Sequence, residues 1–123
     1  MSDIELVREI LTQMLAATQR IERRFSAIGD ANDFLDSDNG VDKLDAICMM
    51  LIAIGESVKN LDKLSQGTLL RKYPEIDWKG VAGMRDVISH RYFDVDAEAV
   101  FNVCKKHIPQ LSKTLRCIID ELS

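Results

Sequence analysis

Residues 3–28 read DIELVREILTQMLAATQRIERRFSAI, and apolar side chains recur through them at alternating intervals of three and four. Those positions are Ile4, Val7, Leu11, Met14, Ile21, Phe25 and Ile28, with the polar Thr18 filling one slot. This spacing is typical of an amphipathic helix that packs against helical partners. We therefore expect one long helix over residues 3–28.

A second long helix is predicted over residues 41–64, after a connection at residues 29–40 that is rich in Gly, Asp and Asn. Its inward face consists of Leu44, Ile47, Cys48, Leu51, Gly55 and Val58. Gly55 lies in the middle of that face, where glycine costs up to ~1 kcal/mol in helix propensity. We expect another helix to approach closely at Gly55, or the helix to bend there.

Three further helical segments follow along the chain. A short segment covers residues 67–72, the next covers residues 78–90, and the last runs over residues 97–122 at heptad spacing. Asp96 is the predicted N-cap of the last helix. Pro109 lies inside that helix and removes one backbone hydrogen bond, so we expect a kink there and not an end.

The composition fits one globular domain. The chain has 123 residues and no strand-like alternation, which predicts a single domain, residues 1–123. The expected fold is all-α, an up-and-down bundle of three long and two short helices. Three isolated cysteines, Cys48, Cys104 and Cys117, indicate reduced thiols and no disulfide frame or zinc site.

Charge and hydropathy restrict where the protein acts. The net charge of −4 argues against a protein that coats nucleic acid through bulk positive charge. Residues 71–91 nevertheless hold five basic and three acidic side chains, a local balance of +2 that suits a local basic cleft. The N-terminal residues lack a signal-peptide pattern and no apolar run could span a bilayer, so we expect a cytoplasmic protein without membrane contact.

The segment at residues 78–90 carries a charge on its apolar face. On a wheel of about 100° per residue, Arg85 falls in the middle of that face. It must be paired, with Glu56 as the candidate, or must line a cleft, because burying it alone is prohibitive. His90 lies about 140° further round the wheel. His90 can meet Arg85 only if the helix ends near His90 or if a second copy of the chain supplies the facing surface.

Arg85, His90 and Tyr92 match the R-x-x-x-x-H-x-Y signature of the HEPN superfamily. The residue after the arginine in that signature is commonly Asn, Asp or His, and here it is Asp86. The flanks resemble the HepT-like proteins of that superfamily, at residues 54–56 (IGE), 73–78 (YPEIDW), 83–86 (GMRD) and 92–96 (YFDVD). Small departures occur at Ser57 and Asp77, where Ala and Pro are common, and neither lies in the motif.

This resemblance implies a HEPN-type bundle that forms a homodimer, with two motifs around a shared cleft. It implies a toxin that is a metal-independent endoribonuclease without a cofactor, paired with a minimal nucleotidyltransferase antitoxin that silences it by AMPylation. In the implied site, Arg85 binds the RNA phosphate and His90 transfers protons to and from the 2′-OH and the leaving oxygen. Asp86 orients one of them, and Tyr92 contacts RNA and accepts AMP.

Two other interpretations stay open at this point. The chain could be a non-catalytic HEPN binding module that partners a nucleotidyltransferase, with the motif serving only as a modification site. Toxicity on expression without the partner would separate these functions. Alternatively, Arg85 and Glu56 could form an ion pair in the core of a purely structural bundle. A metalloenzyme is less well supported, because the two histidines, His90 and His107, show no metal-ligand spacing.

Overall fold

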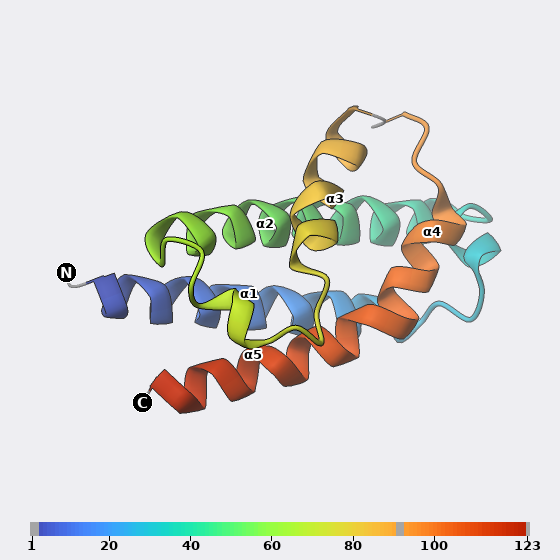
Figure 1. Ribbon diagram of the computed structural model, residues 1–123. Coiled ribbons are helices and arrows are strands. Elements are labelled where there is room, and N and C mark those ends of the chain that lie inside the picture. The colour runs from blue at the N-terminus through green and yellow to red at the C-terminus, as the bar shows by residue number, and fades with distance from the viewer. Residues whose placement is uncertain (1–2, 91–92, 123) are drawn as a thin grey trace.

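The computed structural model describes residues 3–90 and 93–122, and all regular elements in that part of the chain are helical (Figure 1). The helices are α1 (Asp3–Phe25), α2 (Asp38–Leu64), α3 (Trp78–His90), α4 (Ala97–Asn102) and α5 (Ile108–Leu122). Short 3-10 turns cover Ala31–Phe34 and Leu70–Lys72, and a π-helical turn over Val103–His107 joins α4 to α5. The predicted all-α bundle is confirmed.

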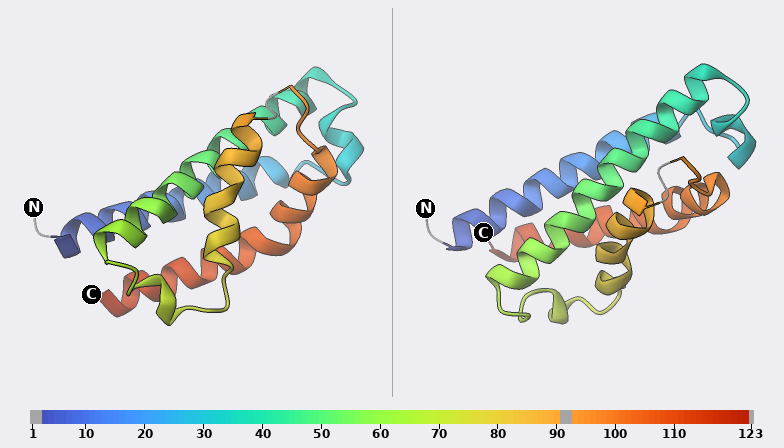
Figure 2. Two further views of the ribbon diagram at one scale, coloured as in Figure 1. Left: turned by 45° about the horizontal axis from the view of Figure 1, so that its top comes forward. Right: turned by 90° about the horizontal axis from the view of Figure 1, so that it is seen from above.

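The long helices run alongside one another. α1 and α2 lie antiparallel, and α5 packs along α1, so that both ends of the chain lie at the same end of the bundle (Figure 1). α3 differs from these three because it crosses α2 steeply (Figure 2), and its end projects beyond α2 (Figure 1). α2 therefore packs against both α1 and α3.

The predicted apolar faces form the core, except for Ile4 at the start of α1, which is 51% exposed. The fully buried side chains of the core include Leu11, Met14 and Ile21 of α1, Ile47, Leu51, Ile54 and Leu61 of α2, and Ile108, Leu115 and Ile118 of α5. α1 ends at Phe25, three residues earlier than expected. Ile28 is nevertheless buried, because a turn in which its amide donates to the Phe25 carbonyl at 2.9 Å returns it to the core.

Local capping sets where α2 begins. The helix begins at Asp38 and not at the expected residue 41, because the Ser37 side chain accepts a hydrogen bond from the Gly40 amide at 3.0 Å. The expected short helix at residues 67–72 is only the 3-10 turn Leu70–Lys72. Both differences lie at element ends, where a single cap or turn outweighs the apolar pattern.

The close approach predicted at Gly55 is confirmed. A Cβ atom placed on Gly55 would lie 3.0 Å from the carbonyl oxygen of Val81 and 3.2 Å from Cβ of Arg85, both on α3. A side chain at this position would push α3 outwards by a few tenths of an ångström, so glycine allows the closest approach of the two helices. Gly55 therefore determines where α3 crosses α2, and Arg85 lies at that crossing.

The last helix bends as expected. Asp96 caps α4, accepting from the amides of Glu98 and Ala99 at 3.0 and 3.2 Å. Directly before Pro109 the chain makes a π-helical turn, in which the Ile108 amide donates to the Val103 carbonyl five residues back. Such a turn accommodates a proline within a helix that continues. α4 and α5 therefore meet at an angle (Figure 1).

Candidate active site

The loop before α3 is fastened to α5 and fixes where α3 begins. The hydroxyl of Tyr73 donates to the Glu121 carboxylate, and the Trp78 indole N–H donates to the Tyr73 carbonyl at 2.9 Å. The side chain of Asp77 accepts from the Gly80 amide at 3.0 Å and so caps the start of α3. Burial of Tyr73, together with the Glu121 carboxylate, raises the pKa of Tyr73 to about 12.

α3 is only partly buried. Ile88 is the one buried residue among its 13 residues, all of which the structure describes. Because the helix packs mainly on α2, the side chains of its outer face stay in contact with solvent. Arg85, Asp86 and His90, three of the four predicted site residues, lie on this one helix.

Arg85 lies between two carboxylates. Its Nε is 2.8 Å from Oε2 of Glu56 on α2, and its Nη1 is 3.0 Å from Oδ1 of Asp86. The predicted partner Glu56 is confirmed, but the core ion pair is wrong. The side chains of Arg85 and Glu56 are 43% and 50% exposed, so the pair lies at the surface.

A second cation of α2 completes this charge network. Nζ of Lys59 lies 3.6 Å from Oδ2 of Asp86, so Asp86 lies between Lys59 and Arg85. We call Glu56, Lys59, Arg85 and Asp86 the α2–α3 charge network. Lys59 is not among the residues predicted from the sequence. Its position three residues after Glu56, on the same face of the helix, is the signal that could have found it.

His90 ends α3 with its ring folded back on the helix. Nδ1 lies 2.7 Å from the backbone carbonyl oxygen of Asp86. Because a carbonyl can only accept, Nδ1 donates to it, and the neutral imidazole then keeps its lone pair on Nε2. Nε2 is thus the atom of His90 available for proton transfer. Tyr92 lies outside the described residues, so its predicted role stays a prediction.

Exposed apolar side chains lie beside the motif. Val87, between Asp86 and the end of α3, is 62% exposed, Met49 of α2 is 66% exposed, and Phe93 after α3 is 99% exposed. A hollow of about 480 Å³ is lined by Met49 and Phe93, with Leu35, Ile52 and Ile88 among its other apolar side chains and Asp42 and Asp45 among its polar ones, whereas Val87 lies outside it. Exposed apolar surface beside a hollow is typical of interaction sites in soluble proteins.

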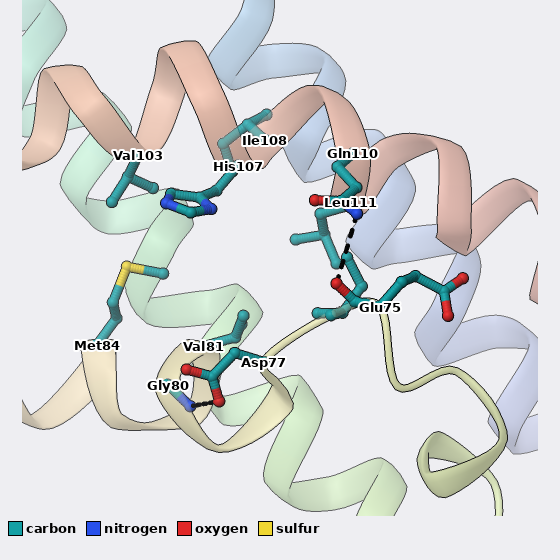
Figure 3. A pocket seen from close by; sticks show the side chains of 11 residues that line it. Glu75, Asp77, Gly80, Val81, Met84, Val103, His107, Ile108, Gln110 and Leu111 are labelled. Carbon is teal, nitrogen blue, oxygen red and sulfur yellow. Dashed lines mark hydrogen bonds between the residues drawn. The ribbon is translucent and has the colours of Figure 1, made fainter.

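A separate cavity of about 340 Å³ lies between α3, the loop before it and the start of α5 (Figure 3). Its floor is apolar, and the side chains of Met84 and His107 point towards one another across it (Figure 3). The amide of Gln110 donates to the Glu75 carbonyl at 3.4 Å at its edge. Since none of Arg85, Asp86 and His90 lines this cavity, it is distinct from the predicted site.

Across residues 3–90 and 93–122, no three His, Cys, Asp or Glu side chains are grouped so that they could hold a metal ion. No helix within these same ranges is both long and apolar enough to cross a membrane.

The helical bundle, with an Arg-x-x-x-x-His motif at the exposed end of a crossing helix, defines a protein of the HEPN class. A family model described as "Ribonuclease HepT-like" matches residues 14–118. The chain belongs to the HepT-like family.

Curated relatives agree with this family. The chain is 40% identical over 77 residues to a protein of Methanocaldococcus jannaschii named as a putative RNase. The aligned residues cover 63% of each chain. It is 38% identical over 66 residues to a protein named as a probable ribonuclease HepT in Thermococcus cleftensis, 54% of this chain and 56% of the relative. The chain thus spans less than two thirds of the length of these relatives. No solved structure matches it significantly.

Proposed function

We propose that the protein is a toxin of a bacterial toxin–antitoxin system that cleaves RNA as a metal-independent endoribonuclease. The observation that carries the proposal is the placement of Arg85, Asp86 and His90 on one exposed helix end, with Nε2 of His90 available for proton transfer. The family membership and the relatives named as ribonucleases support the same function.

The chemistry proposed for these side chains needs no bound metal. The 2′-OH of RNA is itself the nucleophile, so the site has only to move protons and stabilise the charged phosphate. Nε2 of His90 takes the proton from the 2′-OH or returns one to the leaving 5′-oxygen. Arg85 offers N–H donors to the phosphate oxygens as negative charge develops on them. Tyr92 contacts the same phosphate or the neighbouring base.

The proposed working form is a homodimer. Arg85 and His90 point in different directions around α3, so one chain does not surround a scissile phosphate by itself. The apolar surface of Met49, Val87 and Phe93 lies beside the motif and offers a second copy a place to dock. A dimer formed there brings two motifs to one cleft, into which both copies contribute.

Regulation is proposed to come from a minimal nucleotidyltransferase antitoxin. AMP passes from ATP to the hydroxyl of Tyr92, with pyrophosphate as the leaving group, and adds bulk and negative charge to the motif that includes Arg85 and His90. Both effects oppose the binding of an RNA phosphate. Arg85 is also the natural counter-charge for the added phosphate, so modification would occupy the cation that RNA needs.

The two histidines provide a matched test. Purified wild-type protein, His90→Ala and His107→Ala are incubated with total RNA in EDTA, and cleavage is followed on a denaturing gel. Wild type and His107→Ala should cleave, whereas His90→Ala should lose about 10²- to 10⁴-fold in rate, the usual contribution of general acid–base catalysis. Equal cleavage by all three proteins, or none by wild type, would exclude this function at this site.

Expression without the antitoxin distinguishes a nuclease toxin from a non-catalytic binding module. A non-catalytic partner of a nucleotidyltransferase leaves cell growth unchanged, whereas a nuclease toxin arrests it. Growth arrest by wild type, and its absence with His90→Ala at equal protein level, would exclude the binding module. Normal growth with both proteins would favour it.

A further inference from the structure

Glu56 holds Arg85 from a helix that lies outside the motif. The contact between Nε of Arg85 and Oε2 of Glu56 is 2.8 Å, although both side chains are about half exposed. An exposed ion pair contributes little to fold stability. The fold therefore gains little from this well-formed contact, and a role at the site is the better explanation.

Both ends of the Arg85 side chain are fixed relative to α2. Gly55 brings α3 so close that its own Cβ, if present, would lie 3.2 Å from Cβ of Arg85. Glu56, the next residue of α2, then reaches Nε at the far end of the same side chain. Adjacent residues of one rigid helix thus set the position of Arg85 and the direction of its guanidinium group.

This arrangement leaves one part of the guanidinium group for a substrate. Nε faces Glu56 and Nη1 faces Asp86. Nη2 has no acceptor among residues 3–90 and 93–122. A guanidinium group that is fixed at two nitrogens presents the third in one orientation. It therefore loses less conformational entropy when a phosphate binds.

We propose that Glu56 is a positioning residue of the ribonuclease site, which anchors Nε of Arg85 so that Nη2 meets the phosphate of the RNA. The inference rests on the proposed function and extends the site from α3 onto α2. Glu56 itself does not touch RNA and acts only through Arg85. Its carboxylate and that of Asp86 already occupy Nε and one side of Nη1, so a phosphate reaches Arg85 from the Nη2 side.

A double-mutant cycle tests this role. Initial rates of RNA cleavage are measured for wild type, Glu56→Ala, Arg85→Ala and the double variant, with Glu56→Gln as the conservative substitution. Glu56→Ala should lose about tenfold, whereas Glu56→Gln, which keeps an acceptor for Nε–H, should stay within about twofold of wild type. In the Arg85→Ala background, Glu56→Ala should have no further effect.

A control and a second measurement keep the outcomes distinct. Asp62→Ala removes another exposed carboxylate of α2 outside the network and should leave the rate unchanged. The side-chain Nε–H signal of Arg85 in ¹⁵N NMR should be protected from water exchange in wild type and Glu56→Gln, and lost in Glu56→Ala.

Three results would overturn the inference. They are full activity of Glu56→Ala, an equal loss in Glu56→Gln, and an equal loss with and without Arg85. If wild type does not cleave RNA, the proposed function fails. The NMR signal then decides the positioning role by itself: protection lost in Glu56→Ala supports it, and protection kept refutes it.

Discussion

Replacing Gly55 with alanine should separate helix propensity from the close contact between α2 and α3. Alanine favours a helix by about 1 kcal/mol over glycine. At Gly55 the added Cβ would lie 3.0 Å from the Val81 carbonyl and 3.3 Å from that of Ala82, so α3 must move outwards. Overpacking of this kind costs about 1–3 kcal/mol, which equals or exceeds the gain.

Gly83 provides the matched control on the other helix. A Cβ placed there meets nothing within 4 Å, so Gly83→Ala keeps the gain in propensity without the contact. The free energy of unfolding of Gly83→Ala should therefore exceed that of Gly55→Ala by about 1–3 kcal/mol. For a domain of this size, a difference of 2 kcal/mol corresponds to about 8 °C in Tm.

The assay is urea unfolding followed by circular dichroism, at one protein concentration because a dimer would make stability depend on it. RNA cleavage by Gly55→Ala should also fall, because the outward shift of α3 moves Arg85 away from Glu56. If Gly55→Ala is as stable as Gly83→Ala and fully active, the crossing is not tight and the account of Gly55 is wrong.

Two other predictions follow from the charge network and the thiols. Lys59→Gln should weaken RNA binding, and the slope of log binding constant against log salt concentration should become smaller in magnitude by about one. Lys113→Gln on α5 should change neither. An unchanged slope for Lys59→Gln would place Lys59 outside the RNA contact. Burial raises the pKa of Cys48 to about 11 and of Cys104 to about 12, so at pH 8 both thiols stay protonated. Iodoacetamide should therefore label exposed Cys117 alone in the native protein and all three cysteines in denaturant, and fast native labelling of Cys48 would contradict the buried core.

The regular parts of the fold could be predicted because apolar periodicity reports directly on buried helix faces. The glycine at position 55 and the cap at Asp96 were predicted for the same reason, since each has one dominant physical cause. The end of α1 and the start of α2 were missed because they depend on local hydrogen bonds, such as that of Ser37. The π-helical turn before Pro109 was not predicted in detail, because a proline indicates a bend but not its geometry.

The sequence predicted which residues make up the candidate site, but not how exposed they are or all of their contacts. Spacing placed Arg85 and His90 on different sides of α3, and the partner Glu56 was correct. The exposure of that pair could not be predicted, because it depends on how far α3 stands from the bundle. Lys59 was missed although it lies three residues after Glu56 on the same face of α2, because its contact with Asp86 also depends on the angle at which the two helices cross.

The shallow seating of α3 has a consequence for how the protein loses activity. α3 buries Ile88 fully and Trp78, Val81, Ala82 and Met84 in part, whereas α1 and α5 bury six residues each, so α3 has fewer buried contacts to break when it opens. Segments with few buried contacts open at a lower free energy than the whole domain and form cooperative units of their own. On mild heating, RNA cleavage should therefore be lost while the three long helices are still folded. A molecule that binds to α3 should preserve activity at higher temperature without changing the stability of the core.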